Sequence, residues 1–128
     1  MPQPQRLLVV EDDPQMRQLL RKALVREGYD VVSAEDGVQA LETLANDDAF
    51  DLIVTDIRMP RMDGEKLLAE LHQKHPQFKV VLMTAYAELD QYMELMRAGA
   101  VDYLPKPFKI PDLLAVVERS IGPPPAAS

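Results

Sequence analysis

The sequence predicts an α/β fold in which helices cover both faces of a five-stranded parallel sheet. Five short apolar runs alternate with segments whose apolar residues recur at helical spacing. The runs are nearly continuous in apolar residues, which is typical of strands that are covered on both faces. With 128 residues, the chain suits a single domain with one core. This alternation predicts a parallel sheet with right-handed crossovers.

The first strand and helix show how the elements are recognised. Arg6 to Val10 is an apolar run, Asp13 and Pro14 suit the cap and first turn of a helix, and Gly28 ends that helix. Further strands are expected at 30–33, 52–55, 80–83 and 101–104. The other helices are marked by apolar residues at helical spacing: Val38, Leu41, Leu44 and Ala45; Leu67, Leu68 and Leu71; Leu89, Met93 and Met96; Leu113, Leu114 and Val117.

The composition limits the classes of function. The chain lacks cysteine, which excludes disulfides and thiolate metal sites, and its net charge of −7 argues against direct binding of nucleic acid by this domain. No apolar run approaches the roughly 20 residues of a membrane helix, and the N-terminus does not resemble a signal peptide. We therefore expect a cytoplasmic domain over residues 1–121, without membrane contact, and a Pro-rich tail or start of a linker at 122–128.

Polar residues follow the strands at the edge where doubly wound sheets bind ligands. Asp12 and Asp13 follow the first strand, Asp56 the third, Thr84 the fourth and Lys106 the fifth. Because packed carboxylates repel each other, such a site calls for a cation. Mg²⁺ suits a few carboxylates and retained waters, with Mn²⁺ as an alternative. We interpret Glu11, which alternates with its neighbours, as a strand-end residue outside the site.

Each of these residues alone also has a structural explanation, since Asp13 can cap a helix and Asp56 can form a turn. Together, however, they stand within four longer motifs: Val10-Glu11-Asp12-Asp13, the run from Thr55 to Gly64, Met83-Thr84-Ala85-Tyr86, and the run from Gly99 to Phe108. These motifs resemble those of response-regulator receiver domains, in the same order and over about residues 6 to 121. The resemblance implies a flavodoxin-like sheet of strand order 2-1-3-4-5 with five helices.

The resemblance also implies the chemistry of the site. Asp56 would accept a phosphoryl group from the phosphohistidine of a sensor histidine kinase or a phosphotransfer protein. Asp13, Asp56 and the backbone carbonyl of Arg58 would bind Mg²⁺, with Asp12 acting through metal-bound water. Lys106 would bind the phosphoryl oxygens.

Further roles follow from the same resemblance. Thr84 would bind a phosphoryl oxygen, and Tyr103 would be the aromatic switch. Arg58 and Tyr86 would tune the lifetime of the phosphorylated state. We also expect a cis peptide bond between Lys106 and Pro107, which would let the lysine turn inward.

Such a domain is a signalling module rather than an enzyme, because it catalyses only its own phosphoryl transfer and slow autodephosphorylation. Phosphorylation would switch the face formed by the fourth helix, fifth strand and fifth helix. That face would control an output domain beyond Ser128 or the formation of a homodimer, and the resemblance is greatest to receivers of nitrogen-regulation-type activators.

Three other α/β classes fit the sequence less well. A haloacid-dehalogenase-like phosphatase places its nucleophile after the first strand as Asp-x-Asp. Here the two acids after the first strand, Asp12 and Asp13, are adjacent, and the single Asp56 follows the third strand. A flavodoxin-like electron carrier needs a hydroxyl- and Gly-rich loop where this chain has Glu11-Asp12-Asp13. A dinucleotide-binding domain needs Gly-x-Gly-x-x-Gly, which is absent from the sequence.

Overall fold

The computed structural model of the chain describes residues 4–47, 49–57, 62, 64–85, 96–97 and 99–123. Within them lies one parallel five-stranded sheet of order β2-β1-β3-β4-β5. The predicted fold class and strand order are therefore confirmed. The strands are β1 (Arg6–Val10), β2 (Asp30–Ala34), β3 (Leu52–Asp56), β4 (Val80–Ala85) and β5 (Asp102–Lys106).

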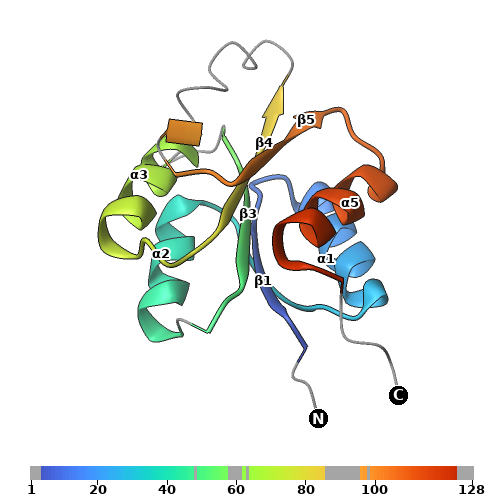
Figure 1. The fold of residues 1–128 in the computed structure, drawn as a ribbon, viewed down its shortest axis with the longest axis horizontal. Coiled ribbons are helices and arrows are strands. Elements are labelled where there is room, and N and C mark those ends of the chain that lie inside the picture. The colour runs from blue at the N-terminus through green and yellow to red at the C-terminus, as the bar shows by residue number, and fades with distance from the viewer. Residues whose placement is uncertain are drawn as a thin grey trace.

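Helices cover both faces of the sheet, as predicted (Figure 1). The fourth expected helix falls mostly outside the described residues, which include its helical positions 96–97. None of the helices in the described ranges is long and apolar enough to cross a membrane. The labelled helices are α1 (Pro14–Glu27), α2 (Gly37–Asn46), α3 (Gly64–Lys74) and α5 (Ile110–Ile121).

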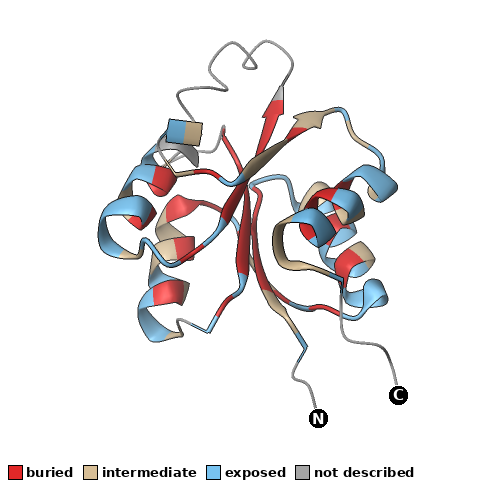
Figure 2. Cartoon of the chain, in the orientation of Figure 1, coloured by how far each residue is buried: buried red, intermediate tan, exposed pale blue. Residues whose placement is uncertain are grey.

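The core consists of two apolar layers, one on each face of the sheet. On one face α2 and α3 pack against alternate strand residues such as Leu8 and Ile53. On the other face α1 and α5 pack against residues such as Val9 and Val54. Figure 2 shows the buried strands in the middle and exposed surfaces on the outer sides of the helices. Because successive strand residues point to opposite faces, both clusters draw on the same strands.

The ends of α1 show why this segment is helical. The side chain of Asp13 accepts a hydrogen bond from the Gln15 amide (3.0 Å), and Pro14 occupies the first turn. At the other end, Gly28 has φ +111°, a left-handed conformation that glycine adopts without steric cost. Its amide donates to the carbonyl of Val25 at 3.0 Å. The predicted bounds of this helix are confirmed.

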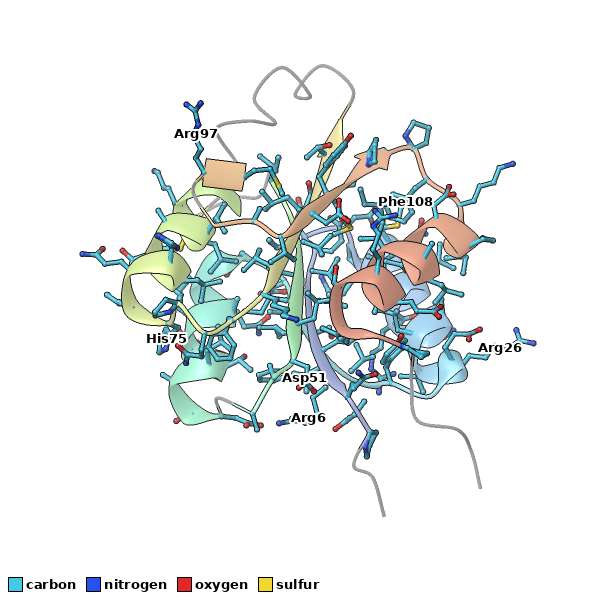
Figure 3. The ribbon with its side chains drawn as sticks, viewed as in Figure 1. Arg6, Arg26, Asp51, His75, Arg97 and Phe108 are labelled. Atoms are coloured by element: carbon cyan, nitrogen blue, oxygen red, sulfur yellow. The ribbon has the colours of Figure 1, made fainter. Side chains whose placement is uncertain are left out.

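Arg6 joins several elements at the end of the sheet opposite the carboxyl ends of the strands. Its Nη1 atom lies 2.7 Å from Oδ2 of Asp47, and its Nε atom lies 3.1 Å from Oδ2 of Asp30. The amide of Arg6 donates to Oδ2 of Asp51 (2.8 Å), and Figure 3 shows these two residues together at this end. The guanidinium also lies over the Phe50 ring, 4.5 Å from its centroid. These contacts hold the first residue of β1 in place at this end of the sheet.

Candidate functional site

Asp56 is the last residue of β3, the middle strand of the sheet. All five residues of β3 are buried, and β1 and β4 pair with it on either side. The amide of the next residue, Ile57, donates to the carbonyl of Met83 at 3.3 Å. The carboxylate of Asp56 is therefore held by rigid backbone at the edge where doubly wound sheets bind ligands.

Glu11 lies beside Asp56, so our interpretation of Glu11 as a residue outside the site is wrong. Val10 pairs with Thr55, which makes the next residues, Glu11 and Asp56, neighbours across the two strands. Only 2% of Glu11 is exposed. Carboxylate oxygens of Glu11, Asp12 and Asp56 all lie within 4.8 Å of one another. The period of two along β1 places Glu11 on the same face as Val9, and Asp56 follows Val54 on that face too.

Lys106 reaches this cluster from the end of β5. Its Nζ atom lies 2.8 Å from Oδ2 of Asp56 and 3.2 Å from Oε1 of Glu11. Lys106 is two residues beyond Leu104, which packs on the face covered by α1 and α5, so strand alternation directs the lysine to the same side. The prediction that Lys106 converges with Asp56 is confirmed.

The electrostatics of the site reflect several carboxylates that share one ammonium group. Burial and then the charge of Asp56 raise the pKa of Glu11 to about 7, although the Asp13 amide and Lys106 act in the opposite direction. Burial by itself would lower the pKa of Lys106. The hydrogen bond to Asp56 and the charges of both carboxylates outweigh burial, so that pKa is raised. Among the described residues, the carboxylates of this site therefore outnumber its ammonium groups.

Asp13 lies outside the carboxylate cluster of Glu11, Asp12 and Asp56, and its role as a direct metal ligand stays a prediction. Its exposed side chain caps α1, and its amide donates to Oε2 of Glu11 at 3.3 Å. Because α1 begins at Pro14, Asp13 takes the cap position, and the acidic residues grouped with Asp56 are Glu11 and Asp12. Arg17 supports this turn by donating to the carbonyl of Glu11 (2.9 Å).

Thr84 lies near the end of β4, one residue beyond Met83, which pairs with Asp56. Thr84 is 1% exposed, and its Oγ1 atom has no hydrogen-bond partner among the residues that the structure describes. A buried hydroxyl without a partner costs about 1–3 kcal/mol, so this atom is suited to bind an incoming group.

Tyr103 in β5 is partly buried and lines a cavity of about 360 Å³ between β5 and α5. Phe108 and Arg119 line the same cavity, and Figure 3 shows Phe108 close to the start of α5. The predicted switch residue therefore lies on the β5–α5 surface.

Two predicted site residues, Arg58 and Tyr86, lie outside the described residues. The peptide bond between Lys106 and Pro107 is cis, which confirms that prediction.

Comparison with known proteins then identifies the family. The sequence model described as the response regulator receiver domain matches residues 7–118. The chain belongs to this family. It is a receiver domain of the two-component signalling type, and phosphorylation and Mg²⁺ binding are general features of such domains.

Individual receiver domains resemble the chain closely. The DNA-binding transcriptional regulator NtrC of Escherichia coli K12 is 44% identical over 114 residues, which are 89% of this chain and 24% of NtrC. The receiver domain of NtrX from Brucella abortus is 35% identical with a TM-score of 0.83, over 90% of this chain and 97% of that one. A CheY-like receiver from Methanospirillum hungatei is 32% identical with a TM-score of 0.86, over 93% and 94%. The chain thus spans about a quarter of the length of NtrC.

Proposed function

We propose that Asp56 takes up a phosphoryl group from a phosphohistidine of a partner protein. A carboxylate oxygen of Asp56 attacks the phosphorus atom, the phosphorus–nitrogen bond breaks, and the imidazole nitrogen keeps the electron pair. The product is an acyl phosphate on Asp56. The observation that carries this proposal is the position of Asp56 at the end of the central strand, with Nζ of Lys106 2.8 Å from its Oδ2 atom.

The carboxylates of Glu11, Asp12 and Asp56 fit a hard divalent cation, and we propose Mg²⁺, with Mn²⁺ as an alternative. All three offer oxygen ligands within 4.8 Å of one another, and the ammonium of Lys106 contacts two of them, Glu11 and Asp56. When bound, the ion offsets negative charge on the transferred phosphoryl group. The carbonyl of Arg58 is proposed as a further ligand on the basis of the family resemblance.

Lys106 and Thr84 are the proposed partners of the phosphoryl oxygens on Asp56. The ammonium of Lys106 already touches the acceptor carboxylate. The hydroxyl of Thr84, which has no hydrogen-bond partner in the part of the chain that the structure describes, gains one if it turns toward a phosphoryl oxygen. That movement provides the signal to Tyr103, which we propose as the switch. Loss of the phosphoryl group is slow, and it is tuned by Arg58 and Tyr86.

Receiver domains interact with histidine kinases or phosphotransfer proteins. We propose that a protein of this class phosphorylates the chain in the cytoplasm. NtrC is a DNA-binding transcriptional regulator, which supports a C-terminal output domain beyond Ser128 for this receiver as well. The output surface comprises β5, α5 and the fourth helix, and on its described part Arg119 pairs with Asp102 at 2.7 Å. This surface also forms the proposed homodimer, and residues 1–121 form the receiver unit.

Fluoroberyllate, a mimic of the phosphoryl group, tests the proposed site directly. We expect the wild-type chain to bind it only in the presence of Mg²⁺, with amide shifts around Asp56, Thr84 and Lys106, and we expect Asp56→Asn not to bind it. Parallel assays for phosphatase turnover and for bound flavin test the competing α/β classes. Binding by Asp56→Asn equal to wild type would refute the acceptor assignment.

A further inference from the structure

Gly37, the first residue of α2, packs so closely on Met62 that no side chain fits between them. A Cβ atom on Gly37 would lie 2.8 Å from Cγ, 2.9 Å from Cβ and 2.9 Å from the carbonyl oxygen of Met62. All three distances are shorter than Cβ contacts in proteins, so one partner would have to move. Because the carbonyl belongs to the main chain, a rotation of the methionine side chain cannot relieve the conflict.

Space, rather than backbone conformation, explains the glycine at this position. Gly37 lies within α2 and does not have the left-handed φ that is found at Gly99. Glycine is also a weaker helix former than alanine. A larger residue would therefore suit the helix itself but not the contact with Met62.

The start of α2 is held by a helix cap, and the segment before it is hydrogen-bonded to Glu11 of the acidic cluster. The side chain of Asp36 is buried and accepts a hydrogen bond from the Gln39 amide at 2.8 Å, which caps the helix. Just before this cap, the carbonyl of Ala34 accepts a hydrogen bond from the amide of Glu11 at 3.1 Å. The backbone of Glu11 is thus hydrogen-bonded to the end of β2, three residues before Gly37.

Met62 lies six residues after Asp56 and packs against the core cluster beneath α2 and α3. Ile57, directly after Asp56, is buried in the same cluster. The chain that leaves the acceptor is therefore held at Ile57 and again at Met62. We infer that Gly37 is a positioning residue for the phosphorylation site, because the space it leaves lets Met62 pack in the cluster that also holds Ile57, the residue directly after Asp56.

This inference rests on the proposed function, since its consequence is the Mg²⁺ affinity of the site at Glu11, Asp12 and Asp56. Isothermal titration calorimetry with Mg²⁺ and thermal unfolding are measured on Gly37→Ala and Met62→Ala. We expect Gly37→Ala to bind Mg²⁺ about 10- to 100-fold more weakly, the usual effect of losing support around metal ligands. Its unfolding temperature should fall, because the conflict with Met62 outweighs the helix preference of alanine.

Met62→Ala removes the anchor from the other side and should also weaken Mg²⁺ binding. If Gly37→Ala does not fold, Met62→Ala alone tests whether the contact between Gly37 and Met62 supports Mg²⁺ binding. The control is Leu44→Val, which trims a fully buried side chain of α2 two turns away from Gly37. It should lower the unfolding temperature and leave Mg²⁺ affinity unchanged.

The outcomes distinguish a failure of the proposed function from a failure of the inference on Gly37. Wild-type chain that does not bind Mg²⁺ refutes the proposed function, and this inference with it. Wild-type binding together with unchanged affinity in the variants at Gly37 and Met62 overturns the inference alone. An equal loss of affinity in Leu44→Val overturns it too, because the effect would then reflect the packing of α2 in general.

Discussion

Glu11 lies next to Asp56 at the carboxyl ends of β1 and β3, and carboxylate oxygens of the two residues come within 4.8 Å of each other. Nζ of Lys106 contacts both, at 3.2 Å and 2.8 Å. The acidic pocket is thus built from the last positions of two neighbouring strands and from Asp12. Of the three consecutive acidic residues, Glu11 and Asp12 lie in the pocket, whereas Asp13 caps α1.

Glu11→Gln should weaken Mg²⁺ binding strongly. The variant keeps the shape of the buried side chain and removes a carboxylate from the cluster. We expect a loss of about 10- to 100-fold in affinity, as for other residues that support metal sites. Calorimetric titration with Mg²⁺ measures it, and an affinity equal to wild type would remove Glu11 from the ligand set.

Asp13→Ala should lower the stability of the fold and leave Mg²⁺ affinity nearly unchanged. Asp13 caps α1 through the Gln15 amide and lies outside the carboxylate cluster. Loss of such a cap lowers the free energy of unfolding by about 1 kcal/mol. Urea denaturation should show this loss while Mg²⁺ affinity stays near wild type. A greater loss of Mg²⁺ affinity in Asp13→Ala than in Glu11→Gln would restore Asp13 as the ligand.

Lys106→Met should strengthen Mg²⁺ binding and abolish the response to fluoroberyllate. The ammonium repels a cation in the pocket. Two unit charges 4 Å apart interact with about 1 kcal/mol at the dielectric of water, so a divalent ion gains about 2 kcal/mol, or about 30-fold in affinity. The same ammonium is the proposed partner of a phosphoryl oxygen. Titrations with Mg²⁺ alone and then with fluoroberyllate separate the two effects. Weaker Mg²⁺ binding in the variant would contradict this account of the charges.

The ion pair between Arg6 and Asp47 should make stability depend on pH below about 4. The hydrogen bond from the Arg6 guanidinium lowers the pKa of Asp47 below its ordinary value of 3.8. A carboxylate with a lowered pKa in the folded state stabilises the fold above its unfolded pKa and loses that effect as pH falls through the folded pKa. The unfolding temperatures of wild type and Asp47→Asn should therefore differ at pH 6 and converge toward pH 2.5. A difference that is constant over this range would contradict the assignment.

Much of the fold could be predicted because local and long-range signals agree. The apolar run of β3 and the cap and glycine that bound α1 each specify their element within a few residues. The alternation of strands and helices then leaves few topologies. The order in which the strands pair is a long-range property, and only the family resemblance supplied it.

The misplacement of Glu11 outside the site has a physical cause. Three acidic residues follow one another after β1, and the sequence does not state the register between β1 and β3. That register pairs Val10 with Thr55 and so brings Glu11 to Asp56. The period of two was a usable signal, since Val9 and Glu11 share a face, and the capping role of Asp13 was already visible beside Pro14. The contact between Gly37 and Met62 left no signal in the sequence.

Activation should increase self-association through the surface that includes β5 and α5. Sedimentation velocity with Mg²⁺ and fluoroberyllate should show a higher mass for wild type than without them. Arg119→Ala, which breaks the pair with Asp102, should reduce this shift. Arg26→Ala on α1 is the matched control and should behave as wild type. An unchanged mass of wild type on activation would refute the proposed dimer.

Chemical mapping of the phosphorylated residue tests the central claim most directly. The chain is incubated with acetyl phosphate and Mg²⁺, the acyl phosphate is reduced with borohydride, and the modified residue is located by peptide mass spectrometry. We predict one modified residue, Asp56, and no modification in Asp56→Asn. A modification at any other residue, or one that persists in Asp56→Asn, would contradict the assignment of Asp56 as the phosphoacceptor.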